Sequence, residues 1–234
     1  MRYQVESTKG VSIAMLMIIC WAGLLTFLLA GYTIRPFSPL TYLFVAIQTH
    51  LFTGLFITAH DAMHGVVSRN KKVNKLIGQI CATLFVFNSY KRLFPKHHEH
   101  HRFVKSEKDP DYYEGNFFMW YFHFMKQYVT VWQIVLAAIT FNILTLVVPQ
   151  LNVILYWVVP SLLSTFQLFY FGTYLPHKGE HAENNVHYSR SQKKNHLWAF
   201  LTCYFFGYHY EHHHAPGTPW WQLYKVKEAN PTEW

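Results

Sequence analysis

Residues 96–102 read KHHEHHR and place four histidines within five consecutive positions. Two other stretches repeat the pattern, HDAMH at residues 60–64 and HYEHH at residues 209–213. On a helix, residues three or four positions apart lie on one face, so each stretch predicts a patch of imidazoles. The predicted patches are His60 and His64; His97, His100 and His101; and His209, His212 and His213.

These eight imidazoles predict a metal site. Neutral imidazole is the commonest metal ligand and suits iron, zinc, copper and nickel. Eight are too many for one tetrahedral zinc ion but suit two adjacent ions, and iron activates dioxygen whereas zinc has no redox chemistry. Residues 60–64 do not match the H-E-x-x-H pattern of zinc proteases, because position 61 is aspartate. The paired Glu-x-x-His motifs of soluble di-iron bundles are also missing.

Uncharged stretches predict an all-α integral membrane protein with four transmembrane helices and a cytoplasmic helical cap. A bilayer core needs about 20 apolar residues. The predicted spans are 11–30, 40–60, 128–148 and 151–174. For 11–30 the alternative is a secretory signal, but the run is long for one and no small-residue cleavage site stands out.

Two shorter segments complete the expected architecture, a single domain over 1–234. Residues 76–88 are apolar but too short to cross, which favours a re-entrant or interfacial segment. Residues 196–214 predict one helix that carries the third histidine patch and ends before Pro216.

The charges predict the topology. The formal net charge is +8, and half of the residues are apolar, which favours contact with anionic lipid over nucleic acid. With four crossings, the far-side turns near 31–39 and 149–151 contain only one basic residue, Arg35. The positive-inside rule therefore predicts a multi-pass protein of the cytoplasmic (inner) membrane, with both termini and the metal site on the cytoplasmic side.

Several stretches resemble the bacterial β-carotene ketolases, within the membrane fatty-acid desaturase and hydroxylase superfamily, whose three histidine boxes hold two irons. They are HDAMHG at 60–65, FGTYLPH at 171–177, YHYEHH at 208–213 and PWWQL at 219–223. Asp109-Pro110-Asp111 after the second box also fits. The resemblance extends over most of the chain from about residue 40. Tyr224 stands where the family tail usually continues with proline.

The resemblance implies a single membrane-bound desaturase-like domain that oxidises C4 of a β-ionone ring. Two successive hydroxylations of the methylene give a geminal diol, which loses water to leave a ketone. Each round takes one dioxygen as co-substrate and two electrons, and the implied cofactor is a pair of iron ions. The substrate is a lipid-soluble carotenoid drawn from the membrane lipid. Since no flavin, haem or ferredoxin-like motif appears, electrons must come from an external donor such as ferredoxin and its reductase.

The resemblance also implies a further metal ligand between the second and third boxes, for which His177 is the best candidate. Its alternative role is an interfacial histidine bonded to a carbonyl, and either His181 or His187 could replace it as ligand. His98 and His214 lie off the centres of the patches, which favours hydrogen-bonding or surface roles.

Carboxylates near the boxes are candidates to orient the ligands by accepting the second imidazole N–H. The candidates are Asp61, Glu99, Asp109, Asp111 and Glu211. A turn or helix cap around Pro110 is an equal explanation for the pair of aspartates that flank it. Trp220 and Trp221 are candidates for the substrate mouth, with an interfacial anchor as the commoner role of such a pair.

Two rival functions remain at this point. A fatty-acid desaturase or hydroxylase, or a carotenoid 3-hydroxylase, would share the metal site and differ in the shape of its substrate tunnel. A membrane metal transporter or sensor would need polar or charged groups within the spans. The centres of the predicted spans lack charge and the histidines gather at one interface, which disfavours this second class.

Overall fold

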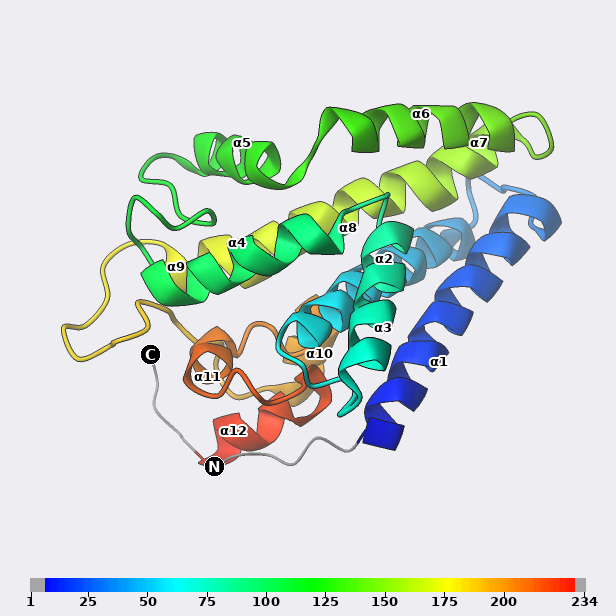
Figure 1. The fold of residues 1–234 in the computed structure, drawn as a ribbon. Helices are drawn as coiled ribbons and strands as arrows, with labels where there is room; N and C mark the ends of the chain where they lie inside the picture. Colours follow the sequence, from blue (N-terminus) through cyan, green and yellow to red (C-terminus); the bar gives the residue numbers. More distant parts are fainter. Residues whose placement is uncertain (1–6, 230–234) are drawn as a thin grey trace.

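The computed structural model describes residues 7–229, in which all regular structure is helical (Figure 1). α1 continues through a π-helical turn to Gly31, and two further π-helical stretches, Ile154–Val158 and Tyr170–Tyr174, join α7, α8 and α9 into one rod. The α-helices are α1 (Ser7–Thr26), α2 (Pro39–Met63), α3 (Lys71–Leu84), α4 (Tyr90–Phe103), α5 (Phe117–Tyr128), α6 (Val131–Leu144), α7 (Gln150–Val153), α8 (Val159–Phe169), α9 (Leu175–His177), α10 (His196–Cys203), α11 (His209–His214) and α12 (Leu223–Ala229).

Three helices are long and apolar enough to cross a membrane. They are Thr8–Gly31, Pro39–Met63 and Gln150–His177, and each contains one of the predicted spans. Their exposed side chains include Leu16 and Ile19 on α1, which suits a face turned toward lipid. In the described residues, three of the four predicted crossings are therefore continuous helices.

The predicted span 128–148 is too long, because the helix within it, α6, runs only from Val131 to Leu144. α5 and α6 meet at a bend of 83°, and only together do they qualify as one broken span. The break follows from the residues between them. Thr130 is extended and forms a capping box with Gln133, in which each side chain accepts a backbone N–H of the other. The chain therefore starts a new helix at Val131.

The predicted helix 196–214 is also wrong as one element. α10 ends at Cys203, and α11 begins at His209. Tyr204 and Phe205 lie between them in the left-handed region, with φ of 49° and 63°. Packing explains the break, because the Tyr204 ring stacks on His50 at 4.1 Å between centroids and its hydroxyl donates to the His50 carbonyl.

The apolar segment predicted at 76–88 belongs to an amphipathic helix, α3, that begins earlier. Asn70 caps α3 by accepting the backbone N–H groups of Lys72 and Val73. The buried face of α3 packs along α2, where Gly78 allows a close approach because a Cβ there would lie 2.9 Å from the Ala62 Cβ of α2 and would also meet the Tyr90 ring of α4. α3 thus returns along α2 instead of crossing separately.

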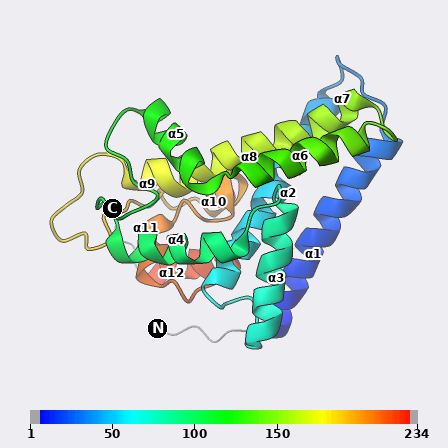
Figure 2. The same ribbon diagram turned by 45° about the horizontal axis from the view of Figure 1, so that its top comes forward.

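Figures 1 and 2 place the α1–α2 turn and the α6–α7 turn together at one end of the molecule. α4 and α11 lie at the opposite end, beside the C-terminal ends of α2 and α9. Buried polar contacts fix the rods against each other: Asn152 donates to the carbonyls of Leu28 and Tyr32, and Thr53 donates to Gln167 at 2.5 Å. The histidine stretches therefore meet at one end of the helical rods.

Candidate metal centre

Nine histidines converge where α2 and α9 end against α4 and α11. They form two groups, in each of which one nitrogen per ring lies within 4.8 Å of the others. We call them the open group and the closed group. The open group is His60, His64, His97, His101 and His212, and the closed group is His100, His177, His209 and His213.

The H-x-x-H-H spacing explains how two helices serve both groups. Consecutive residues on a helix point about 100° apart, whereas residues three or four apart share a face. On α4, His97 and His101 therefore enter the open group while His100 enters the closed group. On α11, His209 and His213 enter the closed group while His212 turns to the open group.

The nitrogens within each group face one another at short range. The Nε2 atoms of His64 and His97 are 2.6 Å apart, and those of His101 and His212 are 3.0 Å apart. In the closed group, His213 Nε2 lies 3.1 Å from His100 Nε2. Nitrogens bound to one ion at about 2.1 Å would lie about 3 Å apart, so these separations match a shared cation.

Unpaired nitrogens support the same conclusion. His60 Nε2 and His177 Nε2 are buried and have no protein hydrogen-bond partner. A buried polar atom without a partner costs free energy, which a bound metal ion would offset. The donor set therefore fits metal ions in both groups.

Burial keeps most of these rings neutral. It lowers the pKa of His209, His212 and His213 well below the usual histidine value, and neighbouring imidazoles add to the effect. The same causes, burial first, lower the pKa of His101 to about 2. Metal binding requires the neutral ring, so these environments favour ligation over protonation.

His100 is the exception, and its partner is Asp109. The His100 Nδ1–H donates to Asp109 Oδ1 at 2.9 Å. Burial lowers the pKa of His100, but Asp111 and Asp109 outweigh it and the pKa is raised. Asp109 also accepts the backbone N–H groups of Lys105 and Asp111. This contact fixes the tautomer that leaves His100 Nε2 facing the closed group, as expected of a residue that orients a ligand.

The other candidate carboxylates have different partners. Asp111 lies 3.8 Å from His100 Nδ1 and accepts the Tyr128 hydroxyl. Asp61 accepts the backbone N–H of Trp220 and has an oxygen 3.7 Å from His60 Nδ1. Both carboxylates lie near an imidazole, but each accepts a hydrogen bond from a different helix: Asp111 from Tyr128 of α5 and Asp61 from the Trp220 backbone.

Glu211 does not make the contact expected of a residue that orients an imidazole. It is fully buried on α11, where it accepts the Ser191 hydroxyl at 2.6 Å and pairs with Lys227 Nζ at 3.1 Å. Glu211 therefore ties α11 to α12 and to the preceding loop. Glu99 is exposed on α4.

His177 occupies the closed group, and the alternatives to it do not. Its Nδ1–H donates to the Tyr188 carbonyl at 2.8 Å, which turns Nε2 toward the group. His181 donates to the Pro176 carbonyl instead, and the His187 ring lies 6.0 Å from His213. His98 and His214 are exposed, and the His98 Nδ1–H donates to the Phe94 carbonyl.

A small cavity of about 40 Å³ touches both groups. Its walls include His60 and His97 from the open group and His100 and His209 from the closed group. A groove of about 490 Å³ continues it between α5, α6 and α8 and is lined mainly by apolar side chains. The residues that line both spaces are Phe56, Phe124, Tyr128 and Leu168.

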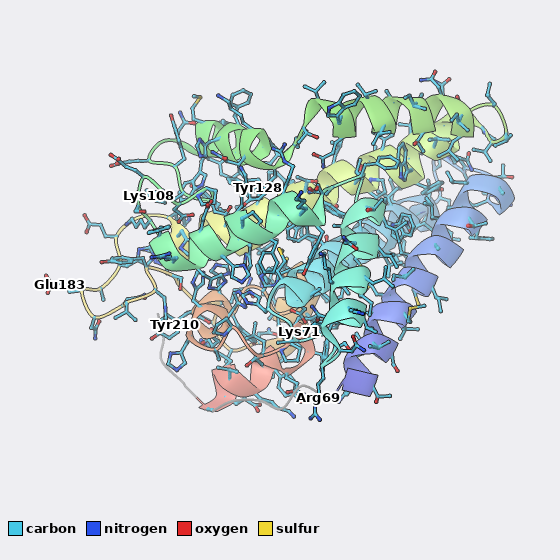
Figure 3. The ribbon with its side chains drawn as sticks, viewed as in Figure 1. Arg69, Lys71, Lys108, Tyr128, Glu183 and Tyr210 are labelled. Carbon is cyan, nitrogen blue, oxygen red and sulfur yellow. The ribbon has the colours of Figure 1, made fainter. Side chains whose placement is uncertain are left out.

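This groove was not predicted from the sequence, and it lies away from the two tryptophans predicted as candidates for the substrate mouth. Trp220 and Trp221 line neither space; Trp220 packs instead against Tyr204, at 5.0 Å between centroids. The sequence feature that could have indicated the groove is the aromatic stretch at 117–124. Its helix, α5, supplies Phe124, which lines both the small cavity and the groove. Figure 3 shows Tyr128 between α5 and α4.

Comparison with known proteins identifies relatives along most of the chain. The fatty acid desaturase family model matches residues 36–131 and 115–233. The chain is 36% identical to a zeaxanthin 4-ketolase from Chlamydomonas reinhardtii over 94% of this chain and 53% of that protein. It is 41% identical to a β-carotene 4-ketolase 3 from Haematococcus lacustris, over 74% and 58% of the two chains.

A third relative is closer in length. A β-carotene ketolase from Paracoccus sp. (strain PC1) is 36% identical over 91% of this chain and 89% of its own. The chain spans little more than half the length of the Chlamydomonas and Haematococcus relatives. No solved structure gives a significant match.

Proposed function

Because this chain belongs to the fatty acid desaturase family, we propose that it is a di-iron β-carotene 4-ketolase. It would convert the C4 methylene of a β-ionone ring into a ketone by two successive hydroxylations. The relatives named as zeaxanthin 4-ketolase, β-carotene 4-ketolase 3 and β-carotene ketolase support this reaction class over desaturation.

The observation that carries the proposal is the small cavity walled by both histidine groups and continued by an apolar groove. A carotenoid is a long hydrocarbon, and its ring would fit a dry space beside the metals while its chain lies along the groove. The groove wall is formed by α5, α6 and α8, and α6 exposes Trp132 and Ile139, which do not line the groove, on its outer side. The substrate would therefore reach the cavity from the lipid.

Two iron ions held by the open and closed groups would activate dioxygen for the oxidation of a C–H bond. The nine histidines would hold the ions, and Asp109 keeps the His100 ring in the orientation that ligation needs. Phe56, Phe124 and Leu168 exclude water and aim the ring at the cavity.

We place the protein in the cytoplasmic membrane, with the histidine groups on the cytoplasmic side. Nineteen of its 20 Lys and Arg lie outside the two predicted far-side turns, which supports this sidedness. The turns 32–38 and 145–149 would face the opposite side. The chain ends themselves, residues 1–6 and 230–234, lie outside the described residues.

The test is expression in a bacterium that accumulates β-carotene, with a second host that accumulates zeaxanthin. We expect new carotenoids in which one or both rings have gained an oxygen and lost two hydrogens, identified by chromatography and mass spectrometry. Unchanged pigments in both hosts together with altered membrane fatty acids would replace the proposal with a lipid-modifying enzyme.

A second test addresses the groove. Ala137→Trp puts an indole into the groove wall and should lower ketone formation while the iron content per chain stays at the wild-type value. Gly23→Trp is the matched control, because nothing lies within 4 Å of a Cβ at this exposed α1 position. Equal activity of both variants would remove the groove from the substrate route.

A further inference from the structure

A third cavity, of about 640 Å³, lies between α3, α4 and the loop that follows α2. Its described lining residues include four basic side chains and no acidic one. The basic residues are Arg69, Lys71, Lys75 and Lys91. Figure 3 shows Arg69 and Lys71 at the end of the molecule where α3 begins. The cavity is therefore a concentrated positive site on a protein that already carries a net charge of +8.

His64 forms part of the wall of this basic cavity. The same ring is a member of the open group, with its Nε2 atom 2.6 Å from that of His97 and its centroid 4.9 Å from those of His101 and His212. His64 is partly exposed, whereas all four members of the closed group are buried. The basic cavity therefore leads from the protein surface to the open group.

The proposed reaction needs electrons from outside the substrate. Each hydroxylation combines the C–H bond, one dioxygen, two electrons and two protons to give a C–OH bond and one water. Two rounds therefore consume four electrons, and the loss of water from the diol consumes none. A reductant has to deliver these electrons to the metal centre repeatedly.

We propose that the basic cavity is the docking site of a small acidic one-electron carrier protein, which delivers electrons to the metal centre by way of His64. The inference rests on the proposed function. In each encounter the reduced carrier loses one electron and the metal centre gains it. Opposite charges on two surfaces speed their encounter and fix their orientation. The exposed lysines of α3 and α4 supply the positive surface, and His64 connects that surface to the open group.

An anionic lipid headgroup would meet the same charges, but the position of the cavity favours the carrier. A headgroup site needs only cationic side chains at the membrane surface. Here the cavity wall includes a member of the open group, which a headgroup does not need and an electron carrier does.

The test uses the full-length protein, loaded with iron, in vesicles of neutral phosphatidylcholine. Reduced plant-type [2Fe–2S] ferredoxin, kept reduced by its reductase and NADPH, serves as the acidic carrier. The variant is Lys71→Glu/Lys75→Glu/Lys91→Glu, in which the three lysines are exposed. The control, Lys193→Glu/Lys194→Glu/Lys225→Glu, makes the same charge change at exposed positions that do not line this cavity.

We expect the cavity variant to raise the apparent KM for ferredoxin at least about tenfold at low salt, and the control variant to raise it less than about twofold. The difference should shrink at high salt, because the screening length falls from about 10 Å at 0.1 M to about 3 Å at 1 M. Dithionite bypasses the carrier, so ketone formed after dithionite reduction should match wild type in the cavity variant.

Three results would overturn the docking proposal. One is an unchanged KM for ferredoxin in the cavity variant. Another is an equal loss of dithionite-driven ketone, which would mean that the lysines support the metal site. The third is dithionite-driven turnover that needs anionic phospholipid in the wild type and loses that need in the variant, which would make the cavity a lipid site. Failure of the proposed function is distinguishable, since the wild type would then make no ketone with either reductant.

Discussion

The open and closed groups both take histidines from α4 and α11 but have different surroundings. The open group adds His60 and His64 from the end of α2, whereas the closed group adds His177 of α9. The open group has five members, of which His64 and His101 are partly exposed, and it borders the basic cavity. The closed group has four members, all buried. Asp109 accepts a hydrogen bond from His100, and the Tyr188 carbonyl accepts one from His177. Both groups contribute walls to the small cavity.

This difference shows how one repeated spacing can produce two unlike candidate metal positions. The imidazoles are chemically the same, so the distinction comes from what packs behind them. A position near the surface can exchange electrons with a partner, whereas a buried position with a carboxylate behind it has a fixed geometry. We expect substitutions in the two groups to have different consequences.

The largest expected effect comes from His100→Ala, which removes the ring that Asp109 orients. Ketone formation should fall more than about 100-fold, because even the loss of an outer partner of a ligand typically costs 10–100-fold. His98→Ala on the same helix is the control, since His98 is exposed and outside both groups. Product is measured by chromatography of the pigments, and equal losses in the two variants would show that the ligand assignment is wrong.

Removal of the metal should have an equally large effect. Chelation of iron in membranes should stop ketone formation, and ferrous iron but not zinc should restore it, because zinc has no redox chemistry. Iron per chain, measured by plasma emission, should be two in the restored protein. Restoration by zinc would contradict the proposed chemistry.

A direct comparison of the groups uses His64→Ala and His177→Ala. The open group would keep four imidazoles and the closed group only three. The His64 variant should therefore retain more iron per chain than the His177 variant after dialysis against a weak chelator. The opposite order would show that exposure, and not ligand number, decides retention.

Asp109→Asn should have a smaller effect than loss of a ligand. The amide can still contact His100 but no longer favours the required tautomer by its charge, so we expect a 10–100-fold loss of metal affinity or activity. Glu99→Gln is the matched control, because Glu99 is exposed on the same helix as His100. A titration with ferrous iron measures the affinity, and equal affinities in the two variants would rule out the orienting role.

The smallest expected effect on catalysis comes from Lys227→Met, which acts on stability. It leaves the buried Glu211 carboxylate without its ion pair, which should lower the free energy of unfolding by about 3–5 kcal/mol. Thermal unfolding in detergent measures the change. The double variant Glu211→Gln/Lys227→Met should recover much of it, and no recovery would mean that the pair does not explain the loss.

The misplaced elements have a common cause. Hydropathy alone predicted a crossing at 128–148, but the Thr130–Gln133 capping box starts a separate helix at Val131, which is bent by 83° from α5. Periodicity alone predicted one helix over 196–214, but Tyr204 packs against His50, which lies far away in the sequence. The first break had a readable local signal, while the second depended on a contact that no local pattern contains.

The sequence by itself determined the donor type, the helical faces that carry the donors and the three continuous apolar rods. These features are local, because side-chain spacing fixes a helix face and segment length fixes whether a helix can cross a bilayer. Only the tertiary structure decided how the histidines divide between two groups, that Glu211 pairs with Lys227, and where the groove and the basic cavity lie. Those features depend on packing between residues distant in the chain.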